Sequence, residues 1–108
     1  MLRAKVRYFT TLHELAGSAE EELEIDEGSV LADLIEEVAS RYGEEARSYL
    51  YFDDEKVDPS IYFLINGVNS RMLSGPKTRL KDGDVVAIIP PIGGGQPVYG
   101  FQKSVSSV

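Results

Sequence analysis

LKDGDVVAIIPPIGGG, residues 80–95, is the stretch of sequence that decides the fold. Its polar opening, Lys81 to Asp84, predicts a turn. Val85 to Ile89 then form an apolar run without polar alternation, which is typical of a central strand. Pro90-Pro91 ends the strand, because proline has no N–H to donate to a ladder and fixes its own backbone angle. We therefore expect a buried last strand in the middle of a sheet.

The opening residues predict the strand that lies beside it. Leu2 to Phe9 alternate at the period of a half-buried strand, and Phe9 is a large aromatic residue on the polar side. Thr10 to Ala16 predicts a short helical turn stopped by Gly17, and Glu20 to Ile25 a second strand that pairs with the first as a hairpin. The side facing the core comprises Ala4, Val6 and Tyr8, and the other side Arg3, Lys5, Arg7 and Phe9.

The main helix is predicted over Val30 to Tyr42, where apolar residues recur at a spacing of three and four. Ser29 is placed to cap its start, and Gly43 follows the last periodic residue, where a left-handed ending costs least. A short helical turn is expected around Glu45 to Tyr49, followed by a loop. The face comprises Val30, Leu31, Leu34, Ile35, Val38, Ala39 and Tyr42.

Ile61 to Ile65 is rich in β-branched and aromatic residues and ends in Asn66-Gly67, a pair that favours a tight hairpin turn. One helix between a hairpin and later strands has to cover one face of a mixed sheet, so the fold class is α+β. We expect the last strand to lie parallel to the first in the middle of the sheet. This is the β-grasp (ubiquitin-like) arrangement, with four to five strands packed against one main helix.

Length and composition define the kind of protein. A chain of 108 residues suits one domain, which we place at residues 1–92, before a flexible glycine tail at 93–95 and a C-terminal extension at 96–108. The sequence has no cysteine, so any sulfur chemistry needs a thiol from another protein. No apolar stretch resembles a secretory signal or a membrane span, so we expect a cytoplasmic protein that does not bind membranes.

The ionisable residues exclude several classes of site. A net charge of −7 works against binding to nucleic acid, where cations must neutralise phosphates. His13 has no second ligand at metal-binding spacing, so no metal site is expected. The paired acids Glu36-Glu37 and Asp53-Asp54 are interpreted as solvated faces and loops, because nothing in the sequence forms a pocket around them.

Gly93, Gly94 and Gly95 have no place in a packed element, because glycine loses more backbone entropy on ordering than any other residue. A triple glycine alone is most simply a linker. Here it follows a strand and a stiff Pro90-Pro91 segment that projects it away from the domain. A tail this thin would fit a narrow tunnel in another enzyme, and the chemistry suited to it uses a terminal carboxylate.

The residues at both ends of this domain resemble a known family. Val6-Arg7-Tyr8-Phe9, Glu14-Leu15-Ala16-Gly17 and the whole stretch from Leu80 to Gly95 are similar to the small subunit of molybdopterin synthase (MoaD). The resemblance runs from about Met1 to Gly95. Its relatives include the thiamin sulfur carrier (ThiS) and the small archaeal modifiers, which share the fold and the terminal Gly-Gly.

The resemblance implies a carrier that has no catalysis of its own and binds no cofactor. A ubiquitin-activating-type adenylating enzyme would use ATP to activate the carboxylate of Gly95, preceded by Gly94, and a partner's persulfide would supply sulfur for a thiocarboxylate. The molybdopterin synthase large subunit would then pass this sulfur to the pterin precursor of a molybdenum or tungsten cofactor. Two alternatives stay open: a modifier whose Gly95 is joined to lysines, and a β-grasp interaction module whose tail is never activated.

A partner surface is expected beside the tail. Strand parity places Phe9 on the outer face of the sheet, together with Val85, Ala87 and Ile89, if Val86 and Ile88 face the helix. The alternative is that Phe9 packs over the turn at Thr10 to Ala16. The residues that the family resemblance assigns to partner contacts are Phe9, Ile89, Pro90, Pro91, Ile92 and Gly93.

The sequence departs from the family after Gly95, where family members end and this chain continues from Gln96 to Val108. As written, Gly95 has no free carboxylate. The extension is therefore a segment removed by a tail-processing protease, an added remnant, or a sign that this copy has lost the carrier role.

Overall fold

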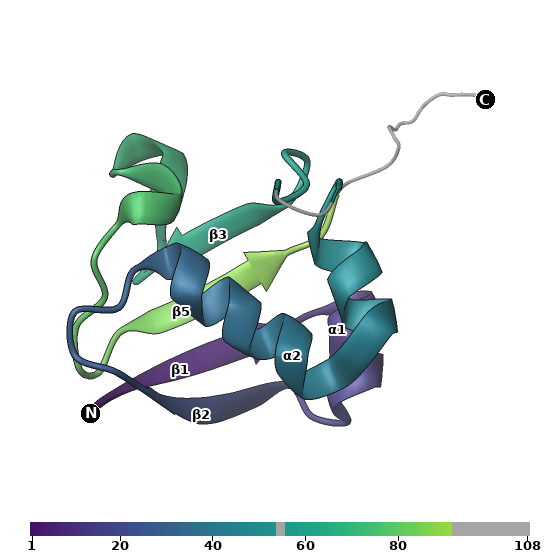
Figure 1. Cartoon of the computed structure of the whole chain (residues 1–108), viewed down its shortest axis with the longest axis horizontal. Coiled ribbons are helices and arrows are strands. Elements are labelled where there is room, and N and C mark those ends of the chain that lie inside the picture. The colour runs from purple at the N-terminus through teal and green to yellow at the C-terminus, as the bar shows by residue number, and fades with distance from the viewer. Residues whose placement is uncertain (54–55, 92–108) are drawn as a thin grey trace.

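The computed structural model describes residues 1–53 and 56–91, which form a five-stranded sheet with one long helix across one face (Figure 1). The predicted hairpin, helix and late strands are all present, in the predicted order. The elements are β1 (Leu2–Tyr8), α1 (Thr10–Ala16), β2 (Glu20–Ile25), α2 (Leu31–Leu50), β3 (Tyr62–Ile65), β4 (Val68–Asn69), the 3₁₀ turns η1 (Ser70–Met72) and η2 (Gly75–Lys77), and β5 (Val85–Ile89).

Strand β5 occupies the centre of the sheet, whose order is β2-β1-β5-β3-β4. It runs parallel to β1, with Val6 beside Val86, and antiparallel to β3, with Phe63 beside Ile88. A parallel neighbour needs a long crossover, which here contains α2 and the β3–β4 hairpin. The predicted β-grasp arrangement and the central position of the last strand are confirmed.

The turn before β5 is tied to the first strand. Asp82 accepts a hydrogen bond from the Arg3 backbone N–H at 2.8 Å, and the Gly83 N–H donates to the Arg3 carbonyl, also at 2.8 Å. Gly83 has φ of 90°, a conformation that glycine adopts without strain. Asp84 accepts from the Asn66 side-chain amide at 3.0 Å, so the same turn also holds the Asn66-Gly67 turn in place. The Asp-Gly-Asp motif thus sets the register of three strands.

The core lies between the sheet and α2, as the alternation predicted. Val6, Val86 and Leu34 are 0% exposed, and Ile88 is 1% exposed. Burial of these side chains is the dominant favourable contribution to folding. The buried residues of α2 before Tyr42 are Leu31, Leu34, Ile35, Val38 and Ala39, which confirms the predicted face.

The start of α2 corrects one expectation, because Ser29 is not its cap. Val30 is the N-cap, and its N–H donates to the Asp33 carboxylate at 2.9 Å. The physical reason lies in tertiary pairing: Val30 forms an isolated β-bridge with Arg79, and the Ser29 carbonyl accepts from the Leu80 N–H at 3.0 Å. This pairing extends the chain one residue further before the helix begins.

Gly43 divides α2 into two helical segments. Its φ of 84° and ψ of −160° are not helical, so the first segment ends where the sequence predicted. The expected turn at Glu45 to Tyr49 is part of a second segment that runs on to Leu50 and buries Ala46 and Leu50. The second segment therefore adds to the same core.

A charge cluster joins the two segments across Gly43. The Arg47 guanidinium donates to both oxygens of Glu36, at 3.1 and 2.6 Å, and the Tyr51 hydroxyl donates to Glu36 at 2.9 Å. These hydrogen bonds, with that from Arg47 first, lower the pKa of Glu36 from 4.5 to about 2. Burial and Glu36 raise the pKa of Tyr51 to about 12.

We expect Leu34→Ala to lower the free energy of unfolding by roughly 2–5 kcal/mol, through lost burial and the cavity left behind. Leu73→Ala is the matched control, because Leu73 is 47% exposed and its truncation should cost no more than about 0.5 kcal/mol. Denaturant titration measures both. Equal losses would show that Leu34 does not face the core.

Glu36→Gln should destabilise the protein only where the carboxylate is charged. A folded pKa near 2, below the ordinary 4.5, means that the stabilisation is fully present above pH 4.5 and is lost as the pH falls toward 2. The difference between wild type and variant in thermal or denaturant unfolding should therefore close over this window. Glu37→Gln, which removes an exposed pair with Arg41 at 3.5 Å, is the control and should have a smaller effect. A difference that persists at pH 2 would contradict the role assigned to the charge.

Candidate docking face and reactive tail

The tail leaves the domain from the centre of the sheet. Strand β5 ends at Ile89, which lies opposite Tyr62 at the beginning of β3. Pro90 is half-buried and Pro91 is exposed. The predicted site residues beyond this point, Ile92, Gly93, Gly94 and Gly95, lie outside the residues that the structure describes. The last described residues thus follow directly from the central strand, at the Tyr62 end of β3.

The outer face of the sheet, away from α2, carries an apolar strip along β5 and β3. Val85, Ala87 and Ile89 are half-buried, whereas Val86 and Ile88 between them are buried against the core, as parity predicted. Leu64 lies beside Ala87 in the pairing register. Tyr62, at the tail end of this strip, is 41% exposed. We call these residues, together with Phe9, the outer-face strip: Phe9, Tyr62, Leu64, Val85, Ala87 and Ile89.

Phe9 comes directly after β1 and occupies the N-cap position of α1. Its backbone is extended, and Thr10 then turns the chain with φ of 47°. The side chain is 40% exposed. Partial cover is compatible with packing near α1, and the exposed part is available to a partner, so the docking role of Phe9 stays a prediction. In register, Tyr8 lies beside Ile88, so the next residues along the two strands are Phe9 and Ile89.

A polar cluster beneath Phe9 was not foreseen from the sequence. Glu21 accepts hydrogen bonds from the Tyr8 hydroxyl at 2.5 Å and from the Tyr42 hydroxyl, and Arg41 lies 3.9 Å from its second oxygen. The two tyrosine rings meet edge to face with centroids 5.9 Å apart. Burial, followed by the hydrogen bond to Glu21, raises the pKa of Tyr8 far above its usual range, and burial also raises that of Tyr42. Both hydroxyls therefore stay protonated donors.

This cluster holds the end of β1 in place and has no reactive group poised for chemistry. A signal for it was present in the sequence: Glu21 has the same strand parity as Leu23 and Ile25, which are buried. A carboxylate on the core side of a strand needs donors close by. Tyr8 and Tyr42 supply them, and their neighbour Phe9 is fixed as a result.

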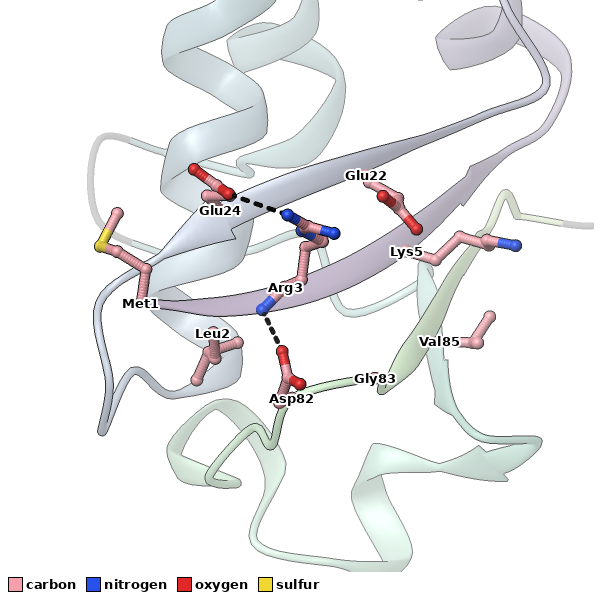
Figure 2. A pocket seen from close by; sticks show the side chains of 9 residues that line it. All are labelled: Met1, Leu2, Arg3, Lys5, Glu22, Glu24, Asp82, Gly83 and Val85. Atoms are coloured by element: carbon pink, nitrogen blue, oxygen red, sulfur yellow. Dashed lines mark hydrogen bonds and ion pairs between the residues drawn. The ribbon is translucent and has the colours of Figure 1, made fainter.

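A shallow hollow of about 490 Å³ lies at the opposite end of the outer face, where β1 begins (Figure 2). Figure 2 shows Arg3 between two acids: its guanidinium lies 3.4 Å from Glu24, and its backbone N–H points at Asp82. These contacts join β1 to β2 through Arg3 and Glu24, and β1 to the turn before β5 through Arg3 and Asp82. The hollow therefore belongs to the sheet's own pairing and is not a second reactive site.

Within residues 1–53 and 56–91, no three histidine or acidic side chains come together as a metal site. No helix in this part of the chain is long and apolar enough to span a membrane.

Comparisons with known proteins agree with this geometry. A molybdopterin synthase sulfur carrier subunit from Chlamydomonas reinhardtii is 34% identical over 94 residues, which are 87% of this chain and 100% of the relative. Small archaeal modifier protein 3 from Haloferax volcanii is 29% identical with the same coverage. The solution structure of small archaeal modifier protein 1 from Methanosarcina acetivorans has a TM-score of 0.75 at 34% identity, over 88% of this chain and 98% of that one.

The family match reaches from the first strand to the tail. The model of the ThiS family matches residues 6–95, so it includes the end of β1 from Val6 to Tyr8, the central strand and all three glycines. The chain therefore belongs to the ThiS family of ubiquitin-like β-grasp proteins, the group of the MoaD-type sulfur carriers and the small modifiers.

Proposed function

We propose that this chain is a sulfur carrier of molybdopterin biosynthesis that is activated at the carboxylate of Gly95. One observation carries the proposal: the central strand β5 continues through Pro90-Pro91 into Gly94-Gly95, and the family match ends at Gly95. The 34% identical relative is itself a molybdopterin synthase sulfur carrier subunit.

The chemistry needs a free carboxylate at Gly95. A carboxylate oxygen attacks the α-phosphate of ATP on an activating enzyme, pyrophosphate leaves, and the acyl adenylate that forms is a good electrophile. The outer sulfur of a partner's persulfide then attacks the carbonyl carbon, and AMP leaves with the bridging oxygen, which gives an acyl disulfide. A second thiol of the partner attacks the partner's own sulfur in that bond, a disulfide forms on the partner, and the thiocarboxylate leaves. Because this chain has no cysteine, a partner supplies the sulfur. The chain contributes the tail and the surface that presents it.

Gln96 to Val108 have to be removed before this chemistry begins. In the full chain the Gly95 carbonyl is an amide to Gln96, which is stabilised by resonance and offers no nucleophilic oxygen to ATP. We therefore include a processing protease among the partners, with the activating enzyme and the large synthase subunit.

A second candidate function is a protein modifier, which the two small archaeal modifier relatives favour. Here a lysine amine attacks the same acyl adenylate and forms an isopeptide bond as AMP leaves. Intact-mass measurement on protein from its native cell separates the candidates. A chain that ends at Gly95 with one oxygen replaced by sulfur supports the carrier. Chains attached to other proteins support the modifier, and an intact Val108 supports the non-conjugating interaction module.

We expect a chain that ends at Gly95 to support ATP–pyrophosphate exchange by the activating enzyme, and the 108-residue chain to be inert. Gly95→Ala in the shortened chain should reduce exchange, because a methyl group enters a tunnel shaped for glycine backbone. Equal exchange by the full chain would show that Gly95 is not the acceptor. Silence from both chains would favour the interaction module.

Phe9→Asp should weaken binding to the activating enzyme at least about tenfold, because a carboxylate in a desolvated contact lacks a partner. The fold should be unaffected, since Phe9 is the N-cap of α1 and aspartate is a favourable cap. Phe52→Asp is the matched control, because Phe52 is 74% exposed and is not part of the outer-face strip. Calorimetric titration measures both. Unchanged affinity for Phe9→Asp would exclude this face as the contact.

A further inference from the structure

Nine of the eleven lysine and arginine side chains of this acidic chain fall into two groups, and Lys56 and Lys103 belong to neither. The lysine and arginine side chains from residue 3 to residue 47 all make ion pairs, at 2.6 to 3.9 Å. The four between residues 71 and 81 make none with any carboxylate that the structure describes, and all four are exposed. We call Val68 to Lys81 the basic segment; its cations are Arg71, Lys77, Arg79 and Lys81, and it contains no acidic residue.

The acids next to the basic segment are engaged elsewhere. Asp84 accepts from the Lys81 backbone N–H at 2.8 Å and from the Asn66 side chain at 3.0 Å. Asp82 accepts from the Arg3 backbone, and Asp58 from Ser60. These carboxylates keep their negative charge, but their hydrogen bonds hold them on local neutral donors and not on the cations of the basic segment. The segment therefore contributes four positive charges and no negative charge to a chain of net charge −7.

The backbone of the basic segment is held in place by its own hydrogen bonds. The Ser74 N–H donates to the Thr78 hydroxyl at 3.0 Å, and that hydroxyl donates to the Gly75 carbonyl at 2.7 Å. The Thr78 carbonyl accepts from the Leu31 N–H at 2.9 Å, which fixes the segment to the start of α2. The segment is therefore already ordered in the free protein, so a partner that binds it loses little free energy to the ordering of its backbone.

Large apolar side chains stand among these cations. Met72 is 80% exposed, Leu73 47% and Val68 44%. Exposed apolar groups beside unpaired cations are typical of a protein interface with an apolar centre and a charged rim. A surface for nucleic acid would be expected to present aromatic faces for stacking, and the ring of Tyr62 is instead covered by Arg71 at 4.9 Å.

Arg71 connects the basic segment to the tail. Its guanidinium lies over Tyr62 and donates to the Pro59 carbonyl. Tyr62 lies opposite Ile89, the last residue of β5 before the prolines. The basic segment, found in Figure 1 as the green turns between β3 and β5, thus reaches the outer-face strip through the contact between Arg71 and Tyr62.

We propose that the basic segment is a second contact for the activating enzyme, which presents to it an acidic surface with an apolar centre. This inference rests on the proposed function and names the partner's chemistry. The contact steers the carrier: attraction between the basic segment and carboxylates turns this side of an otherwise anionic molecule toward the enzyme, so the tail arrives in the right orientation. Charge of this kind changes the rate of encounter more than the chemistry that follows.

The test compares two variants of the chain ending at Gly95 that carry the same change of net charge. Lys77→Glu/Lys81→Glu reverses the basic segment at exposed side chains that make no ion pair with a described carboxylate. Ser48→Glu/Phe52→Glu/Lys56→Glu is the control at three exposed positions in the end of α2 and the loop after it, outside the outer-face strip. We expect the first to raise KM at least about fivefold at low salt with kcat unchanged, and the control to change KM less than about twofold. The difference should shrink in about 1 M salt, where the Debye length is about 3 Å. Met72→Ala/Leu73→Ala should raise KM by an amount that salt does not remove.

Calorimetric binding to the activating enzyme without ATP separates this inference from the proposed function. If wild type binds but releases no pyrophosphate, the carrier function fails, and the affinities of the two charge variants still decide the basic segment. Equal KM and affinity for both variants would overturn the inference alone, and absence of wild-type binding would overturn both. Tighter binding of wild type to a single-stranded RNA oligonucleotide, lost in Lys77→Glu/Lys81→Glu, would assign the segment to a polyanion and overturn it as well.

Discussion

The pairing of β5 with both β1 and β3 is the constraint on which the rest of the structure depends. The last strand fills the gap between two hairpins that have no other direct connection within the sheet. Its buried residues Val86 and Ile88 complete the layer under α2, and its outward residues form the centre of the outer-face strip. Because the tail begins where this strand ends, the position of the reactive end follows from the same pairing that closes the core.

Local patterns in the sequence were enough to predict the elements and the topology, because each pattern was compatible with one kind of secondary structure. The apolar run at Val85 to Ile89 required a central strand, and the spacing from Leu31 to Tyr42 required a helix on one face. Ser29 failed as a cap because the β-bridge between Val30 and Arg79 is a tertiary contact that no local window contains. Glu21 was missed for a related reason: the donors that allow it to lie on the core side, Tyr8 and Tyr42, come from distant parts of the chain. Of the candidate site, the outward positions of Val85, Ala87 and Ile89 followed from parity. The unpaired charges of the basic segment did not, because they depend on where the described carboxylates lie in three dimensions.

The arrangement suits a protein that other proteins bind and modify. The hydroxyls of Tyr8, Tyr42 and Tyr51 and the carboxylates of Glu21 and Glu36 hold strands and helices together. The described surface also carries an apolar strip and a basic segment, and the sequence adds a glycine end. A carrier relative and a modifier relative each align over 87% of this chain.

Because β5 is the last strand of the domain, it also determines the order in which the elements can form during synthesis. A chain still on the ribosome can form the β1–β2 hairpin and α2 early, but β1 has no parallel neighbour until Val85 to Ile89 emerge. Gly94 and Gly95 emerge a few residues later still. A truncated translation product that lacks the closing strand therefore also lacks the glycines, so an incompletely made chain has no end to offer to an adenylating enzyme. Under the proposed function, the strand that completes the fold and the end that is activated are therefore encoded within the same few residues, ahead of the segment that a protease has to remove.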